Sequence, residues 1–223
     1  DLPAKREQEV QNLYEDAKVS LWTEINPAFI ESIPASVPLA TQSKNRKDYV
    51  YHPGSGEVLS ANSVEKLSLI KGSWNGNAPD IQIIISDGLN ARSLMDQGHL
   101  LPFLDGLTKT LRENNYTLSN KNIVIKNGRV RAGYASGEIL FGQKSSLSKR
   151  HAIIHIIGER PGSGHHNFSA YLTVAQSSTW YLKGRVDHDI SKVISGISDS
   201  ALIPQNAIVS TFKIIDDLFL KYR

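Results

Sequence analysis

The fold is decided by the stretch DIQIIIS at residues 80–86 and by the Asp87-Gly88 turn that follows it. The stretch is short, almost wholly apolar and rich in β-branched side chains, which is typical of a central strand buried on both faces. Such strands are usually parallel to their neighbours in the sheet. The stretch therefore predicts further parallel strands beside it and helices that connect them.

The segments that follow alternate between helical and extended patterns. Residues 100–111 repeat apolar residues at helical spacing, and Pro102 fits the first turn of that helix. Residues 122–125 and 152–157 have the composition of two more buried strands, with a short helix predicted between them at 137–143. This order of strands and helices is typical of a parallel sheet.

The last third of the chain adds a strand and a closing helix. Residues 168–174 alternate like a fourth strand, and residues 206–222 place apolar side chains on one face of a helix that Asn206 could cap. Because crossover connections are right-handed, few topologies remain. The predicted fold class is α/β: a Rossmann-like open, mostly parallel sheet with helices on both faces.

The first part of the chain predicts an N-terminal helical and irregular extension of that sheet. Residues 5–24 carry apolar side chains at helical spacing, so this helix needs an apolar partner surface. Four prolines between residues 27 and 56 favour an extended loop, and a capped helix follows Ser60. We therefore divide the chain into an extension and linker at residues 1–73 and a Rossmann-like domain at residues 74–223.

Composition excludes several classes of protein. The chain has 223 residues, no cysteine and a formal net charge of +3, so disulfides and thiolate sites are excluded and we expect no nucleic-acid partner. No apolar run approaches the ~18–20 residues that cross a membrane, so we expect no membrane span. The sequence starts at Asp1 with neither a methionine nor an apolar signal core, so we expect a longer protein upstream and take the cytoplasm as its default location.

Short polar residues follow the strand at 80–86. Ligands of open α/β sheets bind at the carboxyl ends of the strands, so Ser86, Asp87 and Asn90 could hydrogen-bond a large polar ligand that the backbone of Gly88 approaches closely. The same residues are equally typical of an ordinary turn with an aspartate cap. Spacing alone leaves both interpretations open.

The stretch GERPGSG at residues 158–164 is less common. It puts the carboxylate of Glu159 and the guanidinium of Arg160 among three glycines, directly after the strand at 152–157. Such a loop could bend against a ligand, or its two charges could form an ion pair that stiffens it. The chain lacks the glycine pattern of a nicotinamide-binding fold, and it also lacks the motifs of serine hydrolases and P-loops.

Histidine and aspartate clusters elsewhere predict neither a metal site nor a catalytic site. His165 and His166 are adjacent and would point apart, and no nearby carboxylate completes a ligand set. Asp187-His188-Asp189 also suggests carboxylate chemistry, but we assign no role to it. We therefore name no catalytic residue and no metal ligand.

Two motifs together resemble the light chain, or small subunit, of ethanolamine ammonia-lyase. That family carries an Ile-Ser-Asp-Gly-Leu turn and a Gly-Glu-Arg-Pro-Gly loop in this order, and here they stand at residues 85–89 and 158–162. The likeness continues in NGRV at residues 127–130 and covers about residues 79–223. The joint presence of both motifs is much more specific than either motif alone.

The resemblance implies a cobalamin-contacting subunit of a lyase. In that family a Rossmann-like small subunit helps to hold adenosylcobalamin over a barrel-shaped large subunit, where ethanolamine becomes acetaldehyde and ammonia. The likeness implies a hetero-oligomer with that large subunit, separate or fused upstream, in the cytoplasm or a bacterial microcompartment, and a chain that is inactive alone. The cofactor-binding residues that it implies are Ser86, Asp87, Gly88, Leu89, Arg129, Glu159, Arg160, Pro161 and Gly162.

Two segments depart from the family pattern. HPGSGE at residues 52–57 stands where the family has Arg-Pro-Asp-x-Gly-Arg, and residues 191–197 lack the family's arginine, cysteine and asparagine. These differences leave two other hypotheses: a relative that binds another ligand in the same crevice, and a structural or interaction protein without catalysis. Dependence on a partner subunit distinguishes the light-chain hypothesis from these two alternatives.

Overall fold

The computed structural model describes residues 2–144, 149–162 and 166–220. Within them, none of the helices combines the length and the apolar character needed to cross a membrane. The elements follow one another in the order α1 (Leu2–Trp22), α2 (Pro27–Ser32), β1 (Ser36–Ala40), α3 (Arg46–Tyr51), η1 (Pro53–Gly56), α4 (Ala61–Ser73), β2 (Ile81–Ser86), α5 (Arg92–Met95), α6 (Leu100–Glu113), β3 (Asn122–Lys126), α7 (Val130–Phe141), β4 (Arg150–Gly158), β5 (Phe168–Gln176), α8 (Ser177–Tyr181), η2 (His188–Ile190), β6 (Lys192–Ile197) and α9 (Pro204–Leu220).

Six strands of the described residues form one sheet in the order β1-β3-β2-β4-β5-β6. The first four of these run parallel. β5 pairs antiparallel with β4, and β6 pairs antiparallel with β5. The stretch at 80–86 forms β2, a central strand in which Ile84 lies opposite Ile123 of β3 and His155 of β4. The predicted α/β class with a mostly parallel sheet is confirmed, and so is a strand at 168–174.

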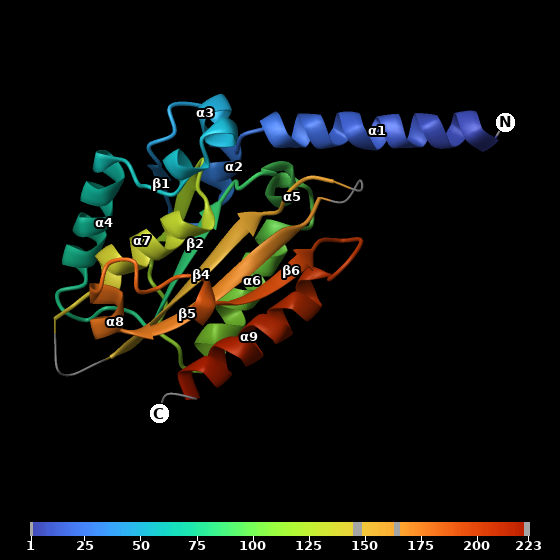
Figure 1. Cartoon of the computed structure of the whole chain (residues 1–223). Coiled ribbons are helices and arrows are strands. Elements are labelled where there is room, and N and C mark those ends of the chain that lie inside the picture. Colours follow the sequence, from blue (N-terminus) through green and yellow to red (C-terminus); the bar gives the residue numbers. More distant parts are fainter. Residues whose placement is uncertain (1, 145–148, 163–165, 221–223) are drawn as a thin grey trace.

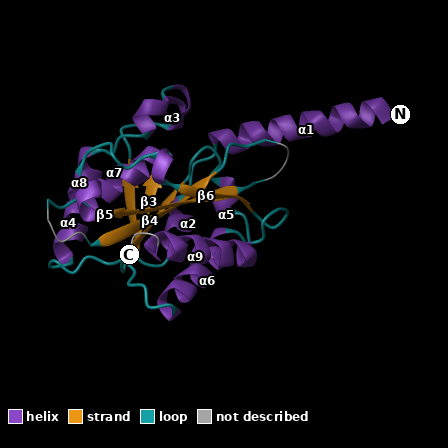
Figure 2. Ribbon diagram, turned by 60° about the horizontal axis from the view of Figure 1, so that its bottom comes forward, coloured by secondary structure: helices purple, strands orange, loops and turns teal. Residues whose placement is uncertain are grey.

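Helices cover both faces of the sheet (Figure 1 and Figure 2). Side chains alternate along β2, so Ile83 and Ile85 pack into a core with Phe103 of α6, whereas Ile84 packs into a second core with Trp180 of α8. The helices α6 and α9 lie over the first core, and α4, α7 and α8 lie over the second. A sheet covered in this way leaves the ends of its strands accessible to a ligand.

The proline-containing segment between residues 27 and 56 is folded, so the prediction of an extended loop there was wrong. Pro27 lies in the first turn of α2, where a missing N–H is tolerated, and Asn26 caps that helix. Pro38 lies in β1, which is an edge strand and can lack one donor. Because β1 pairs with β3, the sheet includes part of the expected linker. The division of the chain at residue 73 stays a prediction.

The helix α7 begins at Val130 rather than at residue 137, where we predicted its start. Two glycines in this segment weaken its helical pattern, and the structure explains both. A Cβ on Gly133 would lie 2.3 Å from the His155 ring, and a Cβ on Gly137 would lie 2.4 Å from the Trp180 ring. The glycines therefore let α7 pack closely against β4 and α8, which outweighs their poor helix propensity.

The helix predicted at residues 5–24 is confirmed as α1, and it projects from the body of the molecule (Figure 1). Residues 3–15 are all exposed, including Val10, which is 66% exposed. Only the last turns return to the body, where Ser20 is buried. The apolar partner surface that this helix needs is therefore not supplied by the described part of the chain along residues 3–15.

Candidate functional site

The carboxyl ends of β2, β3 and β4 meet at one edge of the sheet. After β2 the chain continues to α6 on one face, and after β3 it continues to α7 on the other face. Connections that diverge in this way leave a crevice, which is where open α/β sheets bind ligands. The turns at this crevice are residues 87–90, 127–129 and 158–162.

The turns after β2 and β4 touch backbone to backbone. The Leu89 N–H donates to the Gly158 carbonyl oxygen at 3.3 Å. A Cβ on Gly88, whose φ is +55°, would lie 2.2 Å from that same oxygen, and a Cβ on Gly158 would lie 2.1 Å from the Asn90 carbonyl oxygen. The two motifs found in the sequence therefore form one structural unit, and both need glycine at the contact.

Ser86 and Asp87 are fully buried beneath this contact. The Ser86 Oγ lies 2.8 Å from the Nε2 of His155. The Gly128 N–H donates to Asp87 Oδ1 at 3.3 Å, and Arg46 Nη1 lies 3.7 Å from Asp87 Oδ2. Both side chains thus hold the turns together from inside, and their contact with a ligand stays a prediction.

Burial shifts the pKa values of Asp87 and His155. Loss of hydration raises the pKa of Asp87 to about 6, although Arg46 and the Gly128 N–H both favour its ionised form. Burial likewise lowers the pKa of His155 to about 4. His155 is therefore neutral at pH 7, and Asp87 takes up its proton in mildly acidic solution.

Two arginines stack on one tyrosine beneath the crevice. The guanidinium carbons of Arg46 and Arg129 lie 4.8 and 4.7 Å from the centre of the Tyr49 ring, within cation–π range. The Tyr49 hydroxyl donates to the Gly128 carbonyl oxygen at 3.2 Å, and Arg46 Nη1 donates to the Gly88 carbonyl oxygen at 2.9 Å. Burial raises the pKa of Tyr49 well above its usual range, so its hydroxyl stays a neutral donor. Sequence reasoning missed Arg46 and Tyr49, because no local motif marks them.

The residues at 159–162, in the loop after β4, differ in their exposure and in their partners. Glu159 is half-buried and accepts a hydrogen bond from the Ser169 hydroxyl, and burial raises the pKa of Glu159. Arg160 is exposed and forms no ion pair with Glu159 or with any other described residue. Pro161 is half-buried and Gly162 is exposed. The guanidinium of Arg160 is therefore available to a ligand.

Two hollows open at these turns and share Leu89, Arg129 and Arg160 as lining residues. The smaller hollow, of about 160 Å³, reaches down to Tyr49 and also touches Gly88 and Glu159. The larger hollow, of about 550 Å³, lies between the last turns of α1 and Pro161. The structure thus brings most of the sequence-predicted residues to one surface.

A cluster of charged side chains fixes α1 beside the larger hollow. The His166 imidazole lies between two carboxylates, with Nδ1 2.5 Å from Asp96 Oδ2 and Nε2 2.9 Å from Asp16 Oδ2. Arg92 Nη1 donates to Asp16 Oδ1 at 2.6 Å. Because Asp16 belongs to α1 and the others to the body, the cluster sets the direction in which α1 projects.

The expectation that no carboxylate lies near His166 was wrong, because both partners come from parts of the chain distant in sequence. His165 lies outside the described residues. No group of three or more histidine, aspartate or glutamate side chains among the described residues is arranged to hold a metal ion. Asp187 instead binds Arg131 at 3.1 Å on the surface.

Comparison with known proteins places almost the whole chain in one family. Residues 1–222 match the family described as ethanolamine ammonia-lyase light chain (EutC). The chain belongs to this family. The match includes residues 1–78, which the motifs alone did not cover and which contain Arg46 and Tyr49.

Two similar proteins are both named ethanolamine ammonia-lyase small subunit. The protein from Pseudomonas putida (strain W619) is 28% identical over 141 residues, which are 63% of this chain and 47% of that protein. The protein from Bradyrhizobium diazoefficiens is 29% identical over 136 residues, which are 60% of this chain and 47% of that protein. The chain spans about half the length of these relatives.

Proposed function

We propose that the chain is the small subunit of an adenosylcobalamin-dependent ethanolamine ammonia-lyase, which converts ethanolamine to acetaldehyde and ammonia in the cytoplasm. Membership of the light-chain family supports the subunit and the lyase. The position of the cofactor rests on one observation: the two hollows that share Leu89, Arg129 and Arg160 at the carboxyl ends of the parallel strands.

The residues at these hollows fit the edge of cobalamin, whose corrin ring carries amide groups and whose nucleotide arm carries a phosphate. Arg160 is unpaired among the described residues, and Arg129 lines both hollows, so both guanidiniums can donate to amide or phosphate oxygens. Leu89 and Pro161 offer apolar contacts. Val130 brings the positive end of α7 to the smaller hollow, which also favours an anion.

The other predicted residues act on the cofactor through the shape of the loops. Ser86 and Asp87 lock the turn after β2 from inside, and Gly88 lets it touch the loop after β4. Glu159 anchors that second loop to Ser169 of β5. In this proposal these are positioning residues, and Gly162 continues the exposed loop beside Arg160 and Pro161.

When bound, adenosylcobalamin supplies the radical chemistry through homolysis of its cobalt–carbon bond. The residues of this chain bind and orient one edge of the cofactor and keep water from that edge. Both hollows are open to the surface and the smaller measures only about 160 Å³, so another subunit would cover the rest of the cofactor. We assign no catalytic residue to this chain.

We propose that α1 docks on the large subunit. Val10, Leu13, Tyr14, Ala17 and Leu21 recur at helical spacing on one side of α1, and the last three also line the larger hollow. The docking stripe therefore continues into the proposed cofactor surface. A helix that projects without tertiary contacts is only marginally stable in water, and a partner that covers the stripe would stabilise it.

Titration with adenosylcobalamin tests the proposal, with visible absorbance and calorimetry as readouts. The samples are this chain alone, an ethanolamine ammonia-lyase large subunit alone, and the two mixed. We expect tight binding only in the mixture, together with ammonia release from ethanolamine. Binding without ammonia release would refute the lyase assignment, and no binding in any sample would favour another ligand or a non-catalytic protein.

Replacement of Arg160 by alanine should weaken cofactor binding to the assembled complex by about tenfold or more, because a charge-assisted hydrogen bond is lost. The chain itself should unfold at an unchanged temperature, since the exposed side chain pairs with no other described residue. Arg185→Ala is the matched control, because Arg185 is exposed and lines neither hollow. Equal affinities of the two variants for adenosylcobalamin would remove Arg160 from the site.

The double substitution Val10→Asn and Leu13→Asn should weaken association with the large subunit by about tenfold or more, because it removes two apolar contacts from the stripe. Both side chains are exposed in the free chain, so its stability should change little. Sedimentation velocity of the mixture measures the association. The control is Val19→Asn, which changes another exposed valine on the opposite side of α1; equal loss with this control would contradict the stripe.

A further inference from the structure

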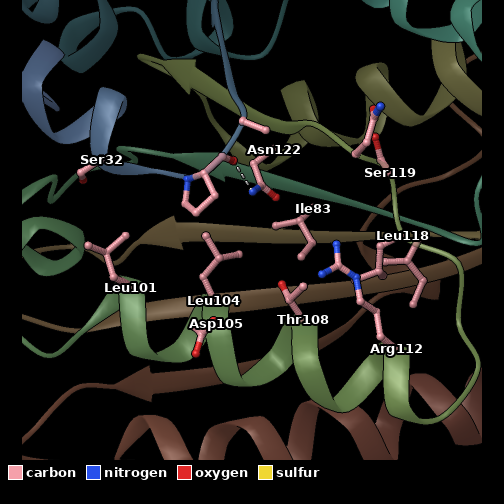
Figure 3. Close-up of a pocket in the computed structure, with 14 residues that line it drawn as sticks. Ser32, Ile83, Leu101, Leu104, Asp105, Thr108, Arg112, Leu118, Ser119 and Asn122 are labelled. Carbon is pink, nitrogen blue, oxygen red and sulfur yellow. Dashed lines mark hydrogen bonds between the residues drawn. The ribbon is translucent and has the colours of Figure 1, made fainter.

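A separate cavity lies at the opposite edge of the sheet, beside the first residues of β1, β2 and β3 (Figure 3). Its volume is about 360 Å³, which is within the ~300–1,000 Å³ of small-molecule sites. It shares no lining residue with either hollow of the candidate cofactor site. A ligand in this cavity would therefore be separate from cobalamin.

The walls of the cavity are mainly apolar. Ile83 of β2 forms the sheet side, Leu101 and Leu104 project from α6, and Leu118 closes the end near the start of β3 (Figure 3). Leu101 is 37% exposed here, although the rest of the apolar face of α6 is buried. The cavity thus offers a ligand apolar surface that is otherwise left in contact with water.

Several polar groups also line the cavity. Arg112 reaches up from the last turn of α6, and Thr108 points its hydroxyl into the space (Figure 3). Neither side chain hydrogen-bonds to another described residue. Asn122 donates its Nδ2 to the Pro34 carbonyl oxygen at 2.8 Å, so this amide is already engaged within the chain. One cation and one hydroxyl donor beside apolar walls favour a carboxylate with an apolar body.

A single negative charge fits this cavity better than two. Asp105 lies on the same helix as Arg112 and also lines the cavity, so it would repel a second carboxylate. We propose that the cavity binds a small organic monocarboxylate, with its carboxylate on Arg112 and Thr108 and its apolar body between Ile83, Leu104 and Leu118. This proposal does not depend on whether the chain binds cobalamin.

Hexanoate is the probe, and NMR chemical shifts of the isotope-labelled full chain are the readout. We expect the largest shifts at Leu104, Thr108 and Asn122, with saturation as hexanoate is added. Hexanol lacks the charge and adipate carries two, so both should bind more weakly than hexanoate. Shifts confined to residues outside the cavity, or hexanol binding as well as hexanoate, would overturn the proposal.

The variant Arg112→Gln should weaken hexanoate binding by about tenfold or more, because the charge-assisted contact is lost. Lys109→Gln is the matched control: it removes the same charge from the same helix, but Lys109 lies 4.0 Å from Glu113 and does not line the cavity. Equal affinities of the two variants would contradict the role of Arg112. Loss of hexanoate binding in the complex with the large subunit would also overturn the proposal, since it would identify this face as a subunit interface.

Discussion

Gly158→Ala should destabilise the chain by about 3 kcal/mol or more and abolish cofactor binding with it. The new Cβ would lie 2.1 Å from the Asn90 carbonyl oxygen and 2.5 Å from the Asp87 carbonyl oxygen. Both oxygens belong to the backbone of the turn after β2, so neither can rotate away as a side chain would. The turns after β2 and β4 must therefore separate, and the hollow between them changes shape.

Thermal unfolding of the purified chain measures this effect, and we expect the Tm to fall by roughly 6 °C or more. Gly162→Ala is the control, because it makes the same chemical change in the same motif, where no heavy atom of the described residues beyond its chain neighbours lies within 4 Å of the new Cβ. That variant should stay within about 0.5 kcal/mol of the parent chain. If both variants unfold at the same temperature, the contact between the two turns does not explain the glycine at residue 158.

The fold could be predicted from the sequence wherever one local pattern dominates. The run of isoleucines in β2 and the helical spacing in α6 each have a single structural interpretation, and both were confirmed. The edge strands β1 and β6 were not predicted as strands, because their short sequences are partly exposed and carry little periodicity. Their structure depends on pairing with β3 and β5, which is a property of the whole sheet.

Some features of the candidate site likewise follow from local sequence, whereas others depend on residues that are distant in the chain. The turns at Gly88 and Gly158 could be predicted, because each follows a recognisable strand and strands of a parallel sheet end at one edge. The stack of Arg46, Tyr49 and Arg129 could not, since it joins α3 to the turn after β3. Nor does any motif indicate that Asp87 faces inward, and that orientation decides its ionisation.

The free energy of unfolding should depend on pH through two buried groups that act in opposite directions. The pKa of His155 is about 4 in the folded chain against 6.5 as its ordinary value, so the unfolded chain binds more protons and stability falls as pH drops from 6.5 to 4. The pKa of Asp87 is about 6 against 3.8, so the folded chain binds more protons and stability falls as pH rises from 3.8 to 6. Each contribution is about 3 kcal/mol, so between pH 4 and 6 they nearly cancel.

Single variants should expose the two contributions, with urea unfolding between pH 4 and 7 as the measurement. Relative to the parent chain, Asp87→Asn should gain about 3 kcal/mol of stability as pH rises from 4 to 6, and His155→Gln should lose about 3 kcal/mol from pH 4 to 6.5. Other acids whose pKa is lowered by folding, such as Asp16 and Asp80, contribute equally to the stability of the parent chain and of the variants. Their contributions therefore cancel from these differences. Asp87→Asn also leaves Arg46 without its ion-pair partner. This changes the free energy of unfolding by an amount that does not vary with pH, because the Arg46 guanidinium stays charged. The double variant should regain the pH dependence of the parent, and two flat difference curves would show that neither group changes its ionisation on folding.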